Sequence, residues 1–345
     1  MKPFVTIIIP CRNEQNFIGK CLDSVLKSDY DQERIEILIA DGMSDDQTRS
    51  VLKTFSDKHK CIRVFDNPEK IVPTALNTGI RAARGEVVIR MDAHNIYPED
   101  YISKCVEYLL KYEVDNVGGI WITMPGGGTA VARMIALALS HPFAVGNAYY
   151  RIGSKTPRYV DTVPFGCYRR DVFDRIGLFD EELIRNQDDE FNLRLLKNGG
   201  KILLAPEIVS SYYARDSLKK LWRMYFQYGY FKPLVVKKIG RVLTVRQLIP
   251  AIFVVVLILS LLLSFFIAPF SYLFGSAVLV YLLVSFGFSF RIAYKEGFGL
   301  RHLLLPVTFA VIHFAYGLGY LKGIFNFFFF RNYRKKLPGD ISLTR

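Results

Sequence analysis

The stretch EVVIRMDAH (residues 86–94) decides the fold and the chemistry expected of this chain. Its apolar run predicts a buried β-strand that ends at the carboxylate of Asp92, with the imidazole of His94 close behind. Oxygen ligands such as carboxylates suit a hard divalent cation, which can hold a phosphate at the end of a strand. A second acidic cluster, NQDDE (residues 186–190), follows much later in the chain. The two clusters predict a cation-held phosphate and a separate general base.

Further apolar runs upstream have the composition of strands buried on both faces. Val5–Ile9 is closed by Pro10, and the run 35–40 ends at Asp41. A short run at 62–65 follows, and helical patterns cover 17–26, 45–55, 73–83 and 98–112. Strands that alternate with helices predict an α/β fold with a mostly parallel, Rossmann-like sheet. Ligands collect at the carboxyl ends of such strands, so Pro10, Asp41 and Asp92 are expected to line one cleft.

The pattern is less regular after residue 112. Strands are expected at 117–123 and 201–205, and helices at 172–176 and 188–196. The small, apolar run 129–139 predicts a helix that lies either at a membrane interface or inside the soluble domain. The basic and aromatic run 217–230 predicts an amphipathic helix at the level of lipid headgroups.

The C-terminal part is overwhelmingly apolar, and residues 247–290 contain no Asp, Glu, Lys or Arg. Spans are expected at 248–268 and 269–290 as a tight hairpin, with a third candidate at 303–321. A third full span would put the basic tail on the side opposite to the soluble domain, against the positive-inside tendency. Pro306, Gly317 and Gly319 leave a kinked or re-entrant third segment open.

The 345 residues carry a net charge of +13, and much of the basic excess flanks the apolar part. This arrangement favours a membrane surface and a cytoplasmic orientation over nucleic acid as the partner. Five cysteines without CxxC spacing indicate free thiols in a reducing compartment. We expect a catalytic domain at 1–215, an interfacial segment at 216–246, a membrane domain at 247–330 and a basic tail at 331–345.

Several motifs occur in an order that resembles family 2 glycosyltransferases with a GT-A fold. They are VTIIIPCRNE (5–14), DGMSDDQT (41–48), NTG (77–79), ARGE (83–86) and MDAH (91–94). The resemblance covers residues 4 to about 232. MDAH, the run 160–181 and YFQYGYFK (225–232) are similar to the ExoA-type enzymes of succinoglycan biosynthesis, which are exopolysaccharide glucosyltransferases with C-terminal membrane helices.

The resemblance implies a donor site at the strand ends. Asp41 would accept a hydrogen bond from the uracil of a UDP-sugar, beside Pro10 and Glu14. Asp92 and His94 occupy the family's Asp-x-Asp position and would bind Mg²⁺ or Mn²⁺ on the diphosphate. His94 departs from that pattern, which leaves open whether it binds the metal or the phosphate. The alternatives are a helix-capping role for Asp41 in an ordinary βα loop and an ordinary surface loop at 92–94.

The resemblance also implies a base and an acceptor site. Asp188 aligns with the general base that deprotonates the acceptor hydroxyl, which implies inversion of configuration. Gln187 replaces a Glu of the family pattern, and Asp189 is the alternative base. An acidic first turn that stabilises the helix N-terminus is compatible with either role. The residues expected to line the acceptor pocket are Gly166, Arg169, Asp189 and Glu190.

The run QYGYF (227–231) replaces the Q-x-x-R-W motif that processive synthases carry at this place. Transfer of a single sugar, rather than processive polymerisation, is therefore expected. The sequence thus predicts an inverting, multi-pass plasma-membrane enzyme with a cytoplasmic catalytic domain. It would move a hexose, glucose being favoured, from UDP-sugar to a polyprenyl-diphosphate-linked saccharide in exopolysaccharide or cell-surface glycan synthesis. Alternatives are transfer to a polyprenyl phosphate, and a nucleotide-binding membrane scaffold without catalysis, which only Gln187 and His94 favour.

Overall fold

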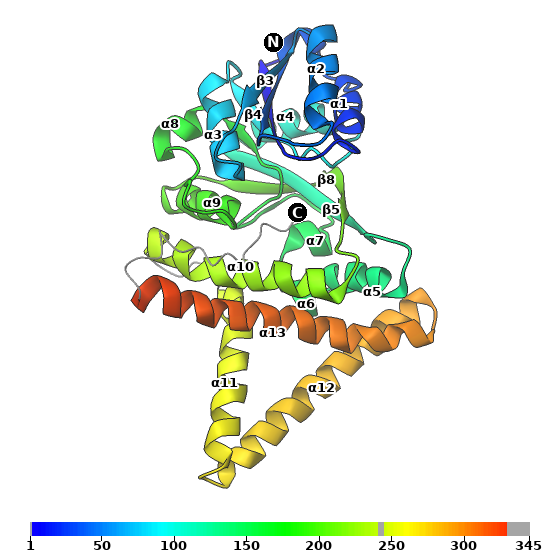
Figure 1. Cartoon of the computed structure of the whole chain (residues 1–345), viewed down its shortest axis with the longest axis vertical. Coiled ribbons are helices and arrows are strands. Elements are labelled where there is room, and N and C mark those ends of the chain that lie inside the picture. Colours follow the sequence, from blue (N-terminus) through cyan, green and yellow to red (C-terminus); the bar gives the residue numbers. More distant parts are fainter. Residues whose placement is uncertain (1, 241–244, 330–345) are drawn as a thin grey trace. The chain divides into compact units, whose positions relative to one another are not determined.

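A computed structural model of the chain describes residues 2–240 and 245–329 (Figure 1). The chain forms two compact units. One comprises the residues up to Ile122 together with Gly153–Tyr212, and the other comprises Thr123–Ile152 together with the described residues from Tyr213 onward. Residues 123–152 therefore group with the C-terminal helices, whereas the sequence predicts one domain over 1–215. The basic tail expected at 331–345 lies outside the described residues.

An eight-stranded sheet forms the centre of the first unit, in the order β3-β2-β1-β4-β7-β5-β8-β6. Strands β3, β2, β1 and β4 are parallel, and β7 is antiparallel to both β4 and β5. The bounds are β1 Val5–Cys11, β2 Ile35–Asp41, β3 Ile62–Asp66, β4 Val87–Arg90, β5 Asn116–Met124, β6 Arg158–Tyr159, β7 Cys167–Arg169 and β8 Ile202–Tyr213. The predicted α/β fold with a mostly parallel sheet is confirmed.

Helices cover both faces of this sheet, because alternate strand residues point to opposite sides. Ile7 and Ile9 of β1 are fully buried in the core that contains Ile18 and Ile102. Ile8 faces the other side, where it packs against Gly79. The helices are α1 Ile18–Leu26, α2 Thr48–Lys58, α3 Val72–Ala82, α4 Tyr101–Lys111, α8 Asp171–Ile176 and α9 Gln187–Lys197, with a 3₁₀ turn η1 at Gln32–Arg34.

The second unit is helical. Its helices are α5 Ala130–Leu139, α6 Pro142–Val145, α7 Tyr149–Ile152, α10 Leu218–Ile239, α11 Ile249–Ser264, α12 Pro269–Glu296 and α13 Leu304–Ile324. Shorter turns are η2 Val245–Gln247, η3 Leu300–Leu303 and the π-helical η4 Phe325–Phe329. Helices α11 and α12 form a hairpin, and α13 runs alongside α10 (Figure 1).

Two helical segments of the described chain are long and apolar enough to cross a membrane. Pro269–Glu296 is only 11% buried over its most apolar window, whereas the corresponding window of Leu300–Phe329 is 50% buried. The first expected span is represented by α11, whose 16 residues fall short of the roughly 20 that a bilayer requires. Length and composition alone therefore do not establish three spans.

The backbones of α10 and α13 touch through glycines. A Cβ added to Gly319 would lie 2.2 Å from the Phe226 carbonyl oxygen, and one added to Gly323 would lie 2.2 Å from that of Tyr230. Gly229 of α10 meets the Tyr316 carbonyl oxygen in the same way, at 2.1 Å. Glycines four residues apart allow two helices to approach this closely. Helices α10 and α13 are therefore closely packed along their contact.

Substitution of Gly319 tests this contact. Gly319→Ala should destabilise the α10–α13 pair by about 1–3 kcal/mol, because the new methyl group has no room beside a carbonyl oxygen. The control is Gly275→Ala in α12, where a Cβ meets nothing within 4 Å and helix propensity favours alanine by about 1 kcal/mol. Thermal unfolding in detergent measures both variants. Equal melting temperatures for the two would contradict the close contact.

Candidate active site

Asp92 lies just beyond the end of β4, where the chain leaves the sheet. Met91 N–H still donates to the Ile8 carbonyl at 3.0 Å, and Asp92 N–H donates to the Tyr97 hydroxyl at 2.7 Å. The Asp92 side chain is 24% exposed. The β-strand therefore delivers this carboxylate to the carboxyl edge of the sheet, as the sequence predicts.

The structure brings the second acidic cluster to the same place. Asp188 lies in the first turn of α9, and its carboxylate forms an ion pair with the guanidinium of Arg90. Arg90 Nη2 also donates to Asp92 Oδ1 at 3.1 Å. One guanidinium thus joins a donor-side carboxylate and the expected base, which are far apart in the sequence. Arg90 has no predicted role in the sequence, because nothing local distinguishes it from any strand-terminal arginine.

Charge and burial set the protonation of this cluster. Burial raises the pKa of the Asp188 carboxyl, and the neighbouring Arg90 offsets only part of that rise. Burial alone would lower the pKa of Arg90, but Asp188 and Asp92 outweigh it and raise that pKa, so the guanidinium stays cationic. A carboxyl with a raised pKa beside a fixed cation has the properties expected of a general base.

Three strand ends meet at this edge. In the β1–β2 register Cys11 pairs with Asp41 at the ends of the two strands, and Pro10 lies just before this pair, beside Ala40. Glu14 follows β1, and its N–H donates to Thr48 Oγ1 at 2.7 Å. His94 Nδ1 lies 3.6 Å from Glu14 Oε1, which links the loop after β1 to the turn after β4.

Asp41 is fully buried, and its carboxylate already has protein partners. It accepts from Ser44 N–H at 3.1 Å, Ser44 Oγ at 2.5 Å and Arg49 Nε at 2.7 Å. Arg49 also pairs with Asp66 at the end of β3. These contacts order the loop after β2, and a nucleobase would have to share the carboxylate with Ser44 and Arg49.

The residues expected to line the acceptor pocket separate into two groups. The Gly166 carbonyl accepts from Arg90 N–H at 3.0 Å, and Asp189 follows Asp188 directly in α9, so both lie next to the carboxylates. Glu190 is 5% exposed, and its Oε1 and Oε2 accept from Arg194 at 2.8 and 2.9 Å. This inward orientation favours a structural role for Glu190 rather than contact with an acceptor.

The structure places Arg169 away from the expected acceptor pocket. Because β7 is antiparallel to β4, Arg169 pairs with Val87 at the start of β4 rather than with its end. Its Nε donates to the Val114 carbonyl at 3.0 Å. Arg90 lies three residue steps along the strand from Val87, which is about 10 Å. The structure therefore does not bring Arg169 to the carboxylates.

The metal-binding prediction can be compared with the donors present. Among residues 2–240 and 245–329 no group of three or more His, Cys, Asp and Glu side chains is arranged to hold a metal. Asp92, with His94 in the following turn, could supply one or two ligands. Mg²⁺ commonly takes only one or two carboxylates from a protein and the rest from phosphates and water. The residues fit a cation that arrives with a diphosphate.

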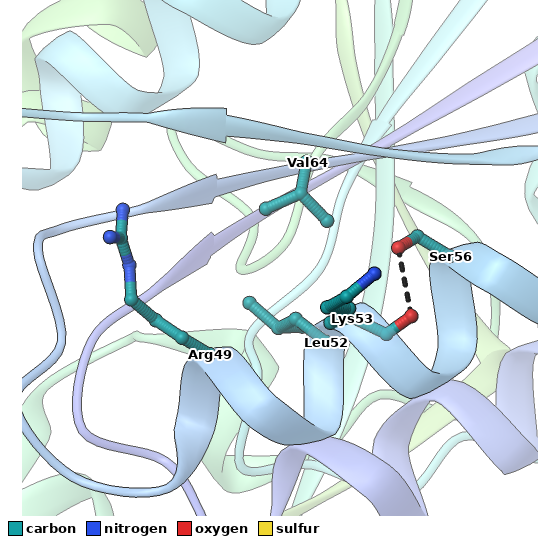
Figure 2. Close-up of a pocket in the computed structure, with 5 residues that line it drawn as sticks. All are labelled: Arg49, Leu52, Lys53, Ser56 and Val64. Carbon is teal, nitrogen blue, oxygen red and sulfur yellow. Dashed lines mark hydrogen bonds between the residues drawn. The ribbon is translucent and has the colours of Figure 1, made fainter.

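A separate pocket of about 230 Å³ lies between α2 and the edge strand β3 (Figure 2). Its lining residues are Arg49, Leu52, Lys53, Ser56 and Val64. The Ser56 hydroxyl donates to the Lys53 carbonyl at 3.1 Å. Only Arg49 connects this pocket to a predicted site residue, through Asp41. The pocket is therefore distinct from the carboxylate cluster.

Comparison with known proteins places the chain in a family. The model of glycosyl transferase family 2 matches residues 6–177. A relative from Methanococcus voltae is 32% identical over 330 residues, which is 93% of this chain and 97% of the relative. It is named dolichyl N-acetyl-alpha-D-glucosaminyl phosphate 3-beta-D-2,3-diacetamido-2,3-dideoxy-beta-D-glucuronosyltransferase.

Two further comparisons agree. Succinoglycan biosynthesis protein ExoA of Rhizobium meliloti is 29% identical over 225 residues, covering 65% of this chain and 67% of that protein. The mannosyltransferase PcManGT from Pyrobaculum calidifontis, solved with GDP-Man and Mn²⁺, has a TM-score of 0.59 at 16% identity. That alignment covers 94% of this chain and 88% of the other. At this identity the structural likeness shows the fold alone.

Proposed function

Because the chain belongs to glycosyl transferase family 2, we propose that it transfers one sugar from a nucleotide-sugar donor to a lipid-linked saccharide. The observation that carries this proposal is the shared contact of Asp92 and Asp188 with Arg90. Transfer needs a group that holds the leaving diphosphate and a base for the attacking hydroxyl, both close to one carbon. At the carboxyl edge of the sheet, Asp92 would supply the first function through a divalent cation, and Asp188 would supply the base.

On the donor side, Asp92 and His94 would hold Mg²⁺ or Mn²⁺ against the diphosphate, with Pro10, Glu14 and Asp41 at the nucleotide. When bound, the cation stabilises negative charge on the leaving group. A UDP-sugar is the proposed donor. Glucose follows from the resemblance to ExoA-type enzymes, whereas the name of the Methanococcus relative specifies an amino-uronic sugar. The donor test must therefore include both kinds of sugar.

On the acceptor side, Asp188 takes the proton of the acceptor hydroxyl. The hydroxyl oxygen attacks the anomeric carbon from the face opposite to the diphosphate, and the bond to the nucleoside diphosphate breaks. One displacement of this kind inverts the anomeric configuration. The name of the Methanococcus relative gives a dolichyl phosphate-linked sugar as acceptor, which supports a lipid-linked acceptor here. A polyprenyl-diphosphate-linked saccharide is the form that we propose.

The enzyme assay uses membranes that contain the full chain, a panel of UDP- and GDP-sugars and extracted lipid-linked saccharides. We expect label in the lipid fraction with Mn²⁺ or Mg²⁺, and its loss with EDTA. Asp188→Asn should lower transfer by about 10²–10⁴-fold and keep nucleotide binding, because only the base is lost. Asp57→Asn, at an exposed i,i+4 ion pair of α2, is the matched control. Transfer by Asp188→Asn at the control rate, with loss in Asp189→Asn, would assign the base to Asp189.

The pH profile provides a second test. A base acts as the carboxylate, so activity that is present above the pKa of Asp188 is lost as the pH falls through it. Because burial raises that pKa above the ordinary value of 3.8, the acid limb of kcat/KM should lie at a higher pH than an unperturbed aspartate gives. Transfer measured from about pH 3 to pH 8 covers both the ordinary and the raised value and tests this. An acid limb at or below the ordinary value would count against Asp188 as the base.

We also propose that the second unit binds a membrane and that the first unit faces the cytoplasm. Exposed basic residues on α10 include Lys219, Lys220, Arg223 and Lys237. Charged groups are costly in hydrocarbon, so α10 belongs at the headgroups. Since α13 contacts α10 backbone to backbone, it must share that depth. The apolar hairpin of α11 and α12 then enters the bilayer, and α13 does not cross it.

Thiol labelling tests this topology. Arg301→Cys precedes α13 and Phe329→Cys follows it, and both positions are exposed. A membrane-impermeant maleimide should label both from the cytoplasmic side, in inside-out vesicles. Phe266→Cys, 86% exposed in the turn between α11 and α12, should stay unlabelled from that side. The unsubstituted chain corrects for native thiols. Labelling of the two ends of α13 from opposite sides would show that α13 spans.

A further inference from the structure

We propose that Arg90 is a positioning residue that sets the geometry between the donor carboxylate Asp92 and the base Asp188. This inference rests on the proposed function and adds a role that none of the sequence motifs assigns. It follows from how the Arg90 backbone is fixed, how its side chain is shared, and how the helix that carries Asp188 is held from behind.

The backbone of Arg90 is fixed on two sides. It is the last residue of β4, and it pairs in register with Ile8 of β1. Its N–H donates to the Gly166 carbonyl at 3.0 Å, in the loop before β7. A Cβ on Gly166 would lie 2.4 Å from the Tyr168 ring, so that loop has little freedom to move. The side chain of Arg90 therefore extends from a backbone that is held in place on both sides.

The side chain of Arg90 is shared between two carboxylates. It is 11% exposed, less than Asp92 at 24% or Asp188 at 36%, so the cation lies beneath the carboxylates. Nη2 binds one oxygen of Asp92 and Nη1 binds one oxygen of Asp188. The planar fork of arginine fixes the angle between its two partners, which the single ammonium of lysine does not. Each carboxylate keeps its second oxygen for a ligand.

The helix that carries Asp188 is held independently. Asn192 lies one turn later in α9 and is fully buried. Asn192 Oδ1 accepts from Asn116 Nδ2 of β5 at 2.9 Å, and Asn192 Nδ2 donates to Thr162 Oγ1 at 2.9 Å. Asp188 is thus held by α9 on one side and by Arg90 on the other. Arg90 belongs to β4 and Asn116 to β5, so the central sheet fixes the position of the base from both sides.

A positioning role differs from a purely structural ion pair in what its loss changes. Two carboxylates on the same side of one cation repel each other when that cation is removed. Loss of the fork would move the base relative to the donor, which lowers kcat and leaves donor binding close to normal. A misplacement of about 1 Å at an active site can cost about 10²-fold in rate. A structural pair would instead lower stability without a selective effect on kcat.

The test compares Arg90→Lys and Arg90→Ala in full-length protein, with wild-type transfer as the reference. Arg90→Lys keeps the charge and loses the fork, so kcat should fall about 10²-fold. The KM for the donor should stay within about threefold, because Lys keeps the charge beneath the diphosphate site.

Added guanidinium at low millimolar concentration should restore at least part of the activity of Arg90→Ala. Arg175 supplies the control, because its guanidinium also joins two aspartates, Asp115 and Asp171, away from the site. Arg175→Lys should leave kcat unchanged.

The outcomes separate the two proposals. Wild-type protein that transfers no sugar from any donor removes the proposed function itself. Active wild-type protein with Arg90→Lys at the wild-type kcat overturns the positioning role. The positioning role is also overturned if both Arg90 variants have a lowered melting temperature, lose transfer activity accordingly, and do not recover it with guanidinium. Recovery of Arg90→Ala by guanidinium shows that the variant is folded and that the missing fork is the cause.

Discussion

A buried guanidinium between two carboxylates is the interaction on which the site depends. Arg90 pairs with Asp92 after the end of β4 and with Asp188 at the start of α9, so it joins two segments that are far apart in the sequence. Each carboxylate alone would be an ordinary partly exposed aspartate. Together around one cation they form a compact charged centre. The burial that raises the pKa of Asp188 is part of the same arrangement.

The sheet explains why this centre lies where it does. The parallel strands β1, β2 and β4 end at one edge. Asp41 is the last residue of β2, and the loops after β1 and β4 carry Glu14 and His94. The 3.6 Å approach of His94 to Glu14 connects two of these loops, and the contacts of Asp41 with Ser44 and Arg49 order the third. In open α/β sheets, ligands bind outside the carboxyl ends of the strands, and these loops lie at that edge. A nucleotide-sugar would meet loops that are already fixed to one another.

The helical unit is organised by a different constraint, the close approach of two backbones. Gly229 of α10 and Gly319 and Gly323 of α13 remove the side chains that would otherwise hold the helices apart. An apolar helix is thereby tied to a basic one. With this pairing, half of the most apolar window of Leu300–Phe329 is covered by protein. Helix α12 of the hairpin has little such cover, since only 11% of its most apolar window is buried.

From its own residues the sequence determined the alternation of strands and helices, the carboxylates at the strand ends and the family. These features can be predicted locally, because hydrophobic periodicity, turn residues and motif residues occur within short stretches of sequence. The tertiary structure decided what long-range register controls. Antiparallel β7 carries Arg169 to the wrong end of β4, an i,i+4 pair turns Glu190 inward, and Arg90 reaches Asp188 across the fold. Pairings between distant segments leave no periodic signal in a single chain, so only the folded structure reveals them.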